Sequence, residues 1–304
     1  MARVALVTAE ELPIPDTETE VVRAALAEVG VGTTVVPWTA PVDWAEYELV
    51  VCRSPWDYFD RVDEFCSWAR ATGKVTRLEN PAEVVVWNAH KSYLVDLAHA
   101  GVPVVPTRLI ARGDATDRAL AGYADDDVVV IKPAVSGGAI DAERLAAGSP
   151  QAAAHLARLA AAGDVLVQPF LPQVHEGEVS LLYFGGRLSH AVRKVPADGD
   201  YRVHELYGGT VEVHRPSPAE LDAAEQVLAA APAATAYARI DLVSGPGGPD
   251  DPLLMEAELI EPELFLRYDP DSVHRFARAL TARLGEPLVD PPGDHGRRSR
   301  PSTG

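Results

Sequence analysis

Short apolar runs and segments of helical periodicity alternate along the first part of the chain. Apolar positions recur at helical spacing from Val21 to Val29, after a Thr-Glu-Thr-Glu segment at residues 17–20 with capping-box spacing. A second helix is expected over residues 62–71. The runs of strand length are Arg3–Thr8, Thr33–Val36 and Leu49–Cys52. This pattern predicts a small open α/β domain over residues 1–84.

The rest of the chain divides into two further predicted domains and a tail. Residues 85–167 contain a helix over 89–100, for which Asn88 is a candidate N-cap, and a helix over 150–162. Residues 168–290 contain hairpins, one turning at Gly185-Gly186, and a helix opened by a capping box at Ser217. Residues 291–304 are rich in Pro, Gly, Asp, Arg and Ser and are predicted to be disordered. The strands predicted in these domains cover residues 104–110, 128–131, 165–170, 179–184, 188–194, 210–214, 236–243 and 253–259, and the last helix covers 272–284.

Charge and cysteine content exclude several classes of partner. The 304 residues include 27 Lys and Arg against 45 Asp and Glu, and this net charge of −18 provides no electrostatic footprint for nucleic acid or for an anionic membrane. The apolar runs are too short to span a bilayer, and the first residues lack the apolar region of a secretory signal. Cys52 and Cys66 form no CxxC motif, so we expect neither a disulfide scaffold nor a structural zinc site. This cysteine usage predicts a cytoplasmic location.

The most informative segment is a pair of predicted strands rich in acidic residues. Arg239 and Asp241 share one face of the first strand, and Glu256 and Glu258 share one face of the second, with Met255 on the opposite face. If the strands pair, three carboxylates converge and repel one another, and a hard divalent cation, Mg²⁺ or Mn²⁺, relieves the repulsion. Taken alone, the pattern also fits a solvated acidic face on an edge hairpin.

Other segments carry candidate phosphate- and nucleoside-binding groups. A predicted strand ends in Lys132 and leads into a Ser-Gly-Gly loop at residues 136–138, where backbone N–H groups and an ammonium group can meet phosphate oxygens. This is no P-loop, because the Lys precedes the glycines, and the N-terminal unit lacks the GxGxxG fingerprint of dinucleotide binding. Gln168 is a candidate reader of an adenine edge, and Glu178 is a candidate partner of ribose hydroxyls. Taken alone, each segment also fits an ordinary turn after a strand.

In this order and spacing, the segments resemble the ATP-grasp superfamily of carboxylate–amine ligases. The resemblance covers roughly residues 85–285. It implies an α/β fold in which an open N-terminal α/β domain precedes two α+β subdomains that grip ATP. By this resemblance, Lys91, Lys132, Ser136, Gly137 and Gly138 bind the phosphates, Gln168, Phe170, Leu171 and Glu178 bind the nucleoside, Asp241, Glu256 and Glu258 bind Mg²⁺ or Mn²⁺, and Lys194, Arg202 and Arg239 act catalytically near the transferred phosphoryl group.

The sequence departs from the family pattern in several places. Of the lysines, Lys74 alone lies outside the matched segments. Glu258 stands where the family usually has Asn, which keeps an oxygen ligand and adds negative charge. His204 stands at another Asn position. The turn after Glu258 has Glu261 and Pro262 where the family has Pro and Gly, so substrate contacts near Glu261 cannot be transferred from the family.

The resemblance also implies a chemistry. ATP phosphorylates a carboxylate to an acyl phosphate, a nitrogen nucleophile attacks it, and ADP and phosphate are released. Residues 53–58 follow a strand end, where open α/β units bind ligands. Arg53 is a candidate clamp for a substrate carboxylate and Asp57 a candidate partner for an ammonium group, with Trp56 and Glu261 as further candidates. A surface Arg53 beside a core-packed Trp56 is the alternative interpretation.

The Arg-Ser-Pro-Trp-Asp-Tyr segment resembles a glutathione-synthetase-like branch of the superfamily. That branch includes cyclo-ligases, so the resemblance implies intramolecular closure of O-ureido-D-serine to D-cycloserine in antibiotic biosynthesis. An amino acid or peptide ligase of secondary metabolism shares the remaining features, and an ATP-dependent phosphotransferase shares the fold. A non-catalytic regulator and a dinucleotide-dependent oxidoreductase fit the sequence less well. Expected partners are ATP and a small amino-acid-like carboxylate, with no nucleic acid or membrane, and a homodimer is compatible with the resemblance.

Overall fold

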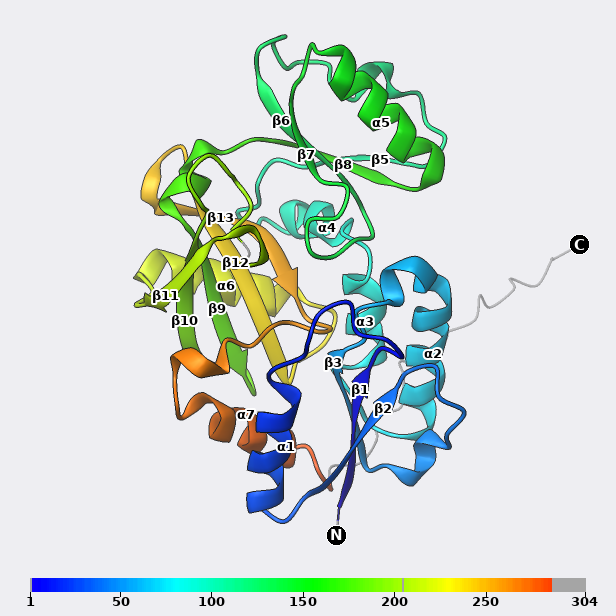
Figure 1. Cartoon of the computed structure of the whole chain (residues 1–304). Coiled ribbons are helices and arrows are strands. Elements are labelled where there is room, and N and C mark those ends of the chain that lie inside the picture. Colours follow the sequence, from blue (N-terminus) through cyan, green and yellow to red (C-terminus); the bar gives the residue numbers. More distant parts are fainter. Residues whose placement is uncertain (1, 204, 286–304) are drawn as a thin grey trace, which may run out of the picture.

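The computed structural model describes residues 2–203 and 205–285, so His204 and the predicted tail over residues 291–304 lie outside the described part. Its strands form three sheets, one of which lies in a smaller upper unit (Figure 1). The strands are β1 (Arg3–Thr8), β2 (Gly32–Pro37), β3 (Leu49–Ser54), β4 (Leu78–Glu79), β5 (Arg108–Ile110), β6 (Val128–Pro133), β7 (Glu143–Ala146), β8 (Val165–Pro169), β9 (Glu178–Phe184), β10 (Arg187–Val195), β11 (Thr210–His214), β12 (Tyr237–Gly245) and β13 (Gly248–Glu258). The helices are α1 (Thr19–Glu28), α2 (Val62–Val75), α3 (Ala82–Asn88), α4 (Tyr93–His99), α5 (Pro150–Ala162), α6 (Pro218–Ala230) and α7 (Ser272–Thr281).

The N-terminal sheet has the order β2-β1-β3-β4 and is parallel. This arrangement confirms the predicted open α/β unit. The start of α1 differs from the prediction, because Asp16 rather than Thr17 caps the helix. The Asp16 Oδ1 atom accepts the backbone N–H groups of Glu18 at 2.9 Å and of Thr19 at 3.0 Å. The side chain of Glu18 is thereby left to face another part of the chain.

The upper sheet, defined here as β5 to β8, is antiparallel with the order β5-β8-β6-β7 and is backed by α5. The strand predicted over residues 104–110 is confirmed only for Arg108–Ile110. Val104 forms a bridge with Leu254 of β13 instead. Pro106 between them has no N–H group and cannot extend the ladder. The edge strand β7 was not predicted, because its sequence lacks an apolar run.

The helix predicted over residues 89–100 is confirmed only for α4, and the unpredicted helix α3 precedes it. Asn88 is the last residue of α3 and not an N-cap. Its amide group donates to the carbonyl oxygen of Ala257 at 2.8 Å and accepts the N–H group of Leu259 at 2.9 Å. The Asn88 side chain thus pairs with backbone hydrogen-bonding groups at the edge of the sheet, in a segment that is distant in the sequence.

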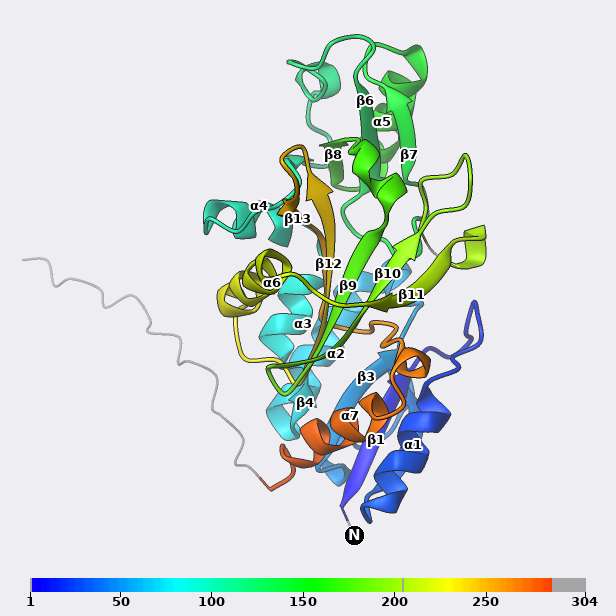
Figure 2. The same cartoon turned by 90° about the vertical axis from the view of Figure 1, so that its left-hand side faces the viewer.

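The third sheet is antiparallel with the order β11-β10-β9-β12-β13, and it confirms the hairpin at Gly185-Gly186. The predicted capping box at Ser217 is present and begins α6, which covers one face of this sheet. Helix α7 covers part of the other face, between the sheet and α1 (Figure 2). Phe276 of α7 packs there with Phe184 and Val192. Farther along the same strands, this second face carries charged side chains.

Two buried polar side chains join the N-terminal domain to the five-stranded sheet. The Asn80 amide donates to the carbonyl oxygens of Tyr237 at 2.9 Å and of Leu259 at 2.6 Å. The Tyr237 hydroxyl lies within 3.1 Å of three carbonyl oxygens, those of Cys52, Glu79 and Ile260. Since buried polar groups require partners, these contacts fix the position of one domain against the other.

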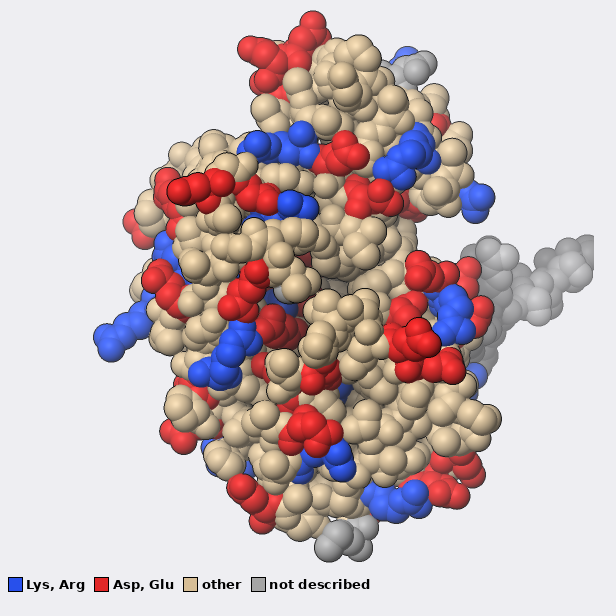
Figure 3. All heavy atoms as spheres, in the orientation of Figure 1, with Lys and Arg blue, Asp and Glu red and all other residues tan. Residues whose placement is uncertain are grey.

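The surface carries charges of both signs. On the face seen in Figure 3, Lys and Arg side chains lie interspersed among Asp and Glu side chains. Cys52 and Cys66 are buried, free thiols. None of the helices within the described ranges is both long and apolar enough to cross a membrane.

Candidate active site

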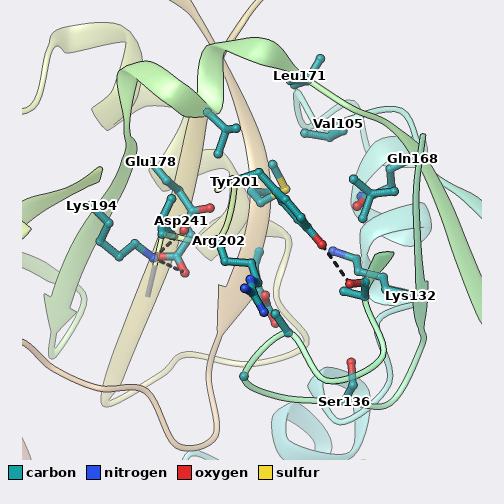
Figure 4. A pocket seen from close by; sticks show the side chains of 18 of the residues that line it. Val105, Lys132, Ser136, Gln168, Leu171, Glu178, Lys194, Tyr201, Arg202 and Asp241 are labelled. Atoms are coloured by element: carbon teal, nitrogen blue, oxygen red, sulfur yellow. Dashed lines mark hydrogen bonds and ion pairs between the residues drawn. The ribbon is translucent and has the colours of Figure 1, made fainter. Parts of the chain in front are cut away.

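A cavity of about 220 Å³ lies between the upper sheet and the charged end of the five-stranded sheet (Figure 4). It is lined by every residue for which the sequence suggested a nucleotide-binding, catalytic or metal-binding role. These residues are Lys91, Lys132, Ser136, Gly137, Gly138, Gln168, Phe170, Leu171, Glu178, Lys194, Arg202, Arg239, Asp241, Glu256 and Glu258.

One wall of the cavity is a network of buried charges on β9, β10 and β12. The Lys194 Nζ atom lies 2.5 Å from Glu178 Oε1 and 3.3 Å from Asp241 Oδ2. The Arg239 Nη2 atom lies 2.9 Å from Asp241 Oδ2, and the Ser180 hydroxyl donates to Asp241 Oδ1 at 2.6 Å. Burial raises the pKa of Asp241, but Arg239 and Lys194 outweigh it and lower the value to about 2. Asp241 is therefore ionised at neutral pH.

A second group of cations comes from other elements. The Lys91 Nζ atom lies 2.8 Å from Glu256 Oε1 and donates to the carbonyl oxygen of Ser136 at 2.8 Å. Burial alone would lower the pKa of Lys91, yet the adjacent Glu256 raises it. Burial and the charge of Lys91 lower the pKa of Lys132, against the opposing effect of Glu256. The two ammonium groups line one cavity together, as binding of a polyphosphate requires.

The predicted metal ligands lie side by side in the β12–β13 ladder, where Asp241 pairs with Glu256 and Arg239 pairs with Glu258. Arg239 donates to the Glu258 carboxylate. Burial, followed by the nearby Glu256 and Asp241 carboxylates, raises the pKa of Glu258 to about 7. Among the residues that the structure describes, no group of three or more His, Cys, Asp or Glu is arranged to hold a metal ion. The donor chemistry nevertheless fits a hard divalent cation, because crowded carboxylate oxygens are what such an ion relieves.

A β-bulge changes one expected side-chain direction. Asp241 is opposite Glu256, whereas Leu242 is opposite Leu254, so Met255 is the extra residue on β13. Met255 and Glu256 consequently both line the cavity. The prediction that Met255 faces away from the site was therefore wrong, because strict alternation holds only in an unbulged strand.

The Ser-Gly-Gly loop at residues 136–138 is packed against two other segments. A Cβ atom on Gly137 would lie only 2.3 Å from the ring of Phe59, which belongs to the 3₁₀ helix η2 (Tyr58–Arg61) of the N-terminal domain. The Tyr207 hydroxyl donates to the carbonyl oxygen of Gly138 at 3.0 Å. Glycine at position 137 thus permits the loop to approach the N-terminal domain closely.

The remaining wall of the cavity is largely apolar. Val105 and Leu171 lie on this side with Gln168, across from Lys194 (Figure 4). The Gln168 amide donates to the Thr107 hydroxyl at 2.8 Å, which orients its side chain. An apolar slot with a few fixed polar groups is typical of a site for a flat ring such as adenine.

Sequence reasoning missed several lining residues, notably Val105, Met255, Tyr201 and Tyr207. Val105 is apolar like any core residue, so nothing in the sequence distinguishes it as a residue that lines the cavity. Tyr201 donates its hydroxyl hydrogen to the carbonyl oxygen of Ala142 at 2.9 Å. The position of Tyr201, an aromatic residue next to Arg202 in a polar loop, was the one sequence signal that could have indicated its place in the cavity.

Two predicted substrate residues are engaged elsewhere. Arg53 is 2% exposed, and its Nη2 atom lies 3.3 Å from Glu18 Oε2. Asp57 accepts the indole N–H group of Trp38 at 2.7 Å and pairs with Arg61 at 3.4 Å. Neither side chain lines the cavity, and each already has a partner of opposite charge within the N-terminal domain. The sequence could not show these partners, because only the fold brings them close.

Trp56 and Glu261 lie at the edge of the site. The Trp56 indole N–H group donates to the Glu261 carbonyl oxygen at 3.4 Å, and Tyr58 is hydrogen-bonded to the Glu261 carboxyl group. Burial, followed by the charge of Glu258, raises the pKa of Glu261 to about 8. Glu261 is thus close to the acidic group of β12 and β13 without lining the cavity itself.

Known proteins match both halves of the chain. Residues 4–80 match the model of the N-terminal domain of the D-cycloserine synthetase DcsG, and residues 97–244 match that of the ATP-grasp domain of prokaryotic glutathione synthetase. The cycloserine biosynthesis protein DcsG of Streptomyces lavendulae is 36% identical over 305 residues, with 93% of this chain and 99% of that protein covered. The chain belongs to the ATP-grasp family. It is an ATP-dependent ligase of that family.

Solved structures agree with this assignment. The crystal structure of D-cycloserine synthetase DcsG matches this ATP-grasp enzyme with a TM-score of 0.84 and 33% identity, covering 93% of this chain and 100% of that one. D-alanyl-alanine synthetase A from Vibrio cholerae matches with a TM-score of 0.67 at 15% identity, covering 95% of this chain and 99% of that one, which shows the fold alone. The predicted ATP-grasp fold and the predicted enzyme class are confirmed. Members of the family use ATP and a divalent metal ion in general.

Proposed function

We propose that this enzyme uses ATP and Mg²⁺ to convert O-ureido-D-serine into D-cycloserine. The observation that supports this substrate most strongly is the similarity to DcsG along 93% of the chain, which includes the N-terminal domain as well as the ATP-grasp domain. The cavity described above supports the chemistry, since it gathers the cations and carboxylates that phosphoryl transfer requires.

In the first step, an oxygen of the substrate carboxylate attacks the γ-phosphorus of ATP, and the bond to the ADP oxygen breaks. Lys91, Lys132 and the loop at residues 136–138 hold the phosphates. Arg239 and Lys194 stabilise the negative charge that spreads over the transferred group. Mg²⁺, held by Asp241, Glu256 and Glu258, would supply further neutralisation of phosphate charge. The product of this step is an acyl phosphate, which has a far better leaving group than a carboxylate.

In the second step, the ureido nitrogen bonded to oxygen attacks the acyl carbon within the same molecule. Phosphate leaves, the nitrogen loses its proton, and the five-membered ring closes. Hydrolysis of the carbamoyl group on this nitrogen, to carbon dioxide and ammonia, then completes the atom balance from O-ureido-D-serine to D-cycloserine. The loop at residues 136–138, packed against Phe59, shields the acyl phosphate from water during ring closure.

The deciding experiment measures ADP, phosphate and D-cycloserine after incubation of the enzyme with ATP, Mg²⁺ and O-ureido-D-serine. A parallel reaction contains hydroxylamine, which traps an acyl phosphate as a hydroxamate. We expect equal amounts of ADP, phosphate and ring product, and hydroxamate in the trapped reaction. A stable phosphorylated product would support a phosphotransferase instead. Turnover of other amino acids but not of O-ureido-D-serine would support an intermolecular ligase.

Two lysines provide a matched test of the site. Lys132 lines the cavity, whereas Lys74 is exposed on α2. Lys132→Met is expected to raise the KM for ATP at least about tenfold, because a charged hydrogen bond to phosphate is lost. Lys74→Met is expected to leave ADP release unchanged. Equal effects of the two substitutions would refute the assignment of the cavity to ATP.

A further inference from the structure

The acidic side chains around the active site differ in their partners. Asp241 is paired with Arg239 and Lys194, Glu256 with Lys91, and Glu258 with Arg239. Within the described part of the chain, no Lys or Arg forms an ion pair with the Glu261 carboxylate, which instead is hydrogen-bonded to Tyr58. Glu261 is therefore the carboxyl group of this set that forms no ion pair with Lys or Arg, and its raised pKa would fall once an ammonium group lies beside it.

The position of Glu261 is fixed from both sides. Tyr58, which is 5% exposed, holds the carboxyl group, and the Trp56 indole holds the carbonyl oxygen of the same residue at 3.4 Å. Both aromatic residues follow the carboxyl end of β3, where open α/β sheets bind ligands. Glu261 as a whole residue is only partly buried.

The substrate of the proposed function presents the matching charge. The substrate carboxylate must reach the cations of the cavity. The carbon atom to which this carboxylate is attached also carries an ammonium group. That ammonium group would lie close to Lys91 and Arg239, which repel it. A carboxylate that has no ion pair of its own would offset this repulsion if it lies beside the ammonium group. Asp241, Glu256 and Glu258 are already committed to cations, whereas Glu261 is not.

We infer that Glu261 binds the ammonium group of the substrate and thereby selects α-amino carboxylates. This inference rests on the proposed function and adds a specificity-determining residue to it. Tyr58 and Trp56 position the carboxylate, and the cations of the cavity hold the reacting end of the same molecule.

The test compares O-ureido-D-serine with its desamino analogue, which keeps the carboxylate and the ureido group. ADP release is measured at saturating ATP and Mg²⁺ for the wild-type enzyme, Glu261→Gln and Glu263→Gln. Glu263 is the matched control, because it lies on the same segment but its side chain pairs with Arg267 at 2.6 Å. We expect the wild-type enzyme and Glu263→Gln to prefer the amino substrate in kcat/KM by about 10- to 100-fold, as loss of a charged hydrogen bond predicts. In Glu261→Gln this preference should nearly disappear, while the KM for ATP stays unchanged.

Several outcomes would overturn the inference. An unchanged preference in Glu261→Gln would show that another group reads the ammonium. A rise in the KM for ATP as large as that for the amino substrate would show that Glu261 maintains the site as a whole. If the wild-type enzyme does not turn over O-ureido-D-serine, the proposed function fails and the inference fails with it. Thermal melting of each variant, together with a Glu261→Asp variant that should retain part of the preference, separates these results from misfolding.

Discussion

Replacing the buried Glu18 by Gln is expected to destabilise the protein more than any exposed charge change. Glu18 is 7% exposed, and its carboxylate accepts the N–H groups of Leu264 at 2.7 Å and Leu266 at 2.9 Å and pairs with Arg53 at 3.3 Å. Gln keeps one acceptor oxygen, but it removes the carboxylate charge that pairs directly with the buried guanidinium of Arg53. Removing one partner of a buried ion pair costs about 3–5 kcal/mol. That is a large fraction of the roughly 5–15 kcal/mol by which a domain is stable.

The assay is urea and thermal unfolding of Glu18→Gln beside Glu20→Gln. Glu20 pairs with Arg23 at 2.8 Å on the exposed side of α1, so its substitution should cost no more than about 1 kcal/mol. A double variant, Glu18→Gln with Arg53→Met, should recover part of the loss, because no buried charge then remains unpaired. If Glu18→Gln unfolds at the same urea concentration as Glu20→Gln, the contact between the N-terminal domain and residues 264–266 contributes little, and the reasoning is refuted.

Three further outcomes are expected. Gly137→Ala should lower turnover at least about tenfold, because the new Cβ would lie 2.3 Å from the Phe59 ring. Adding Phe59→Ala should restore part of the activity. If Gly137→Ala has no effect on ADP release, the close packing is contradicted. Asp241→Asn should abolish turnover while circular dichroism stays unchanged, and near-normal Mg²⁺-dependent activity in this variant would exclude Asp241 as a metal ligand. The folded state raises the pKa of Glu261 from 4.5 to about 8, so it binds more protons than the unfolded state in this range, and stability should fall as the pH rises from about 4.5 to 8. Melting temperatures at pH 5 and pH 8 should differ less in Glu261→Gln than in the wild type, and equal differences would contradict that pKa.

The sequence was most informative where local pattern determines structure. Alternation predicted the β12–β13 pair and the common face of Asp241 and Glu256, and the Ser217 capping box predicted the start of α6. The charged groups of the cavity could also be named in advance, since Lys132 and Arg239 lie beside glycine or acidic residues at recognisable spacing. Each of these features depends on neighbours a few residues away, so the chain alone contains the signal.

Features that depend on distant partners could not be predicted. Arg53 looked like a free clamp after a strand, and only the fold shows that Glu18 neutralises it. Asn88 looked like an N-cap, yet it satisfies the edge of β13. Met255 lines the cavity because of a β-bulge, and the position of this bulge depends on the pairing of β13 with its partner strand β12. In each case a single polar or apolar residue is compatible with several environments, and tertiary contacts decide among them.

The contacts of Asn80, Tyr237 and Glu18 have a consequence for protein engineering. They connect the N-terminal domain to residues 236–237 and to residues 259–266, so the partners of this domain lie in two stretches that are distant from each other in the sequence. A chimera that exchanges residues 1–84 alone would separate these matched halves. Transferring residues 1–84 together with residues 236–237 and 259–266 keeps both partners of these interdomain hydrogen bonds and carries Glu261 along with the aromatic residues that hold it.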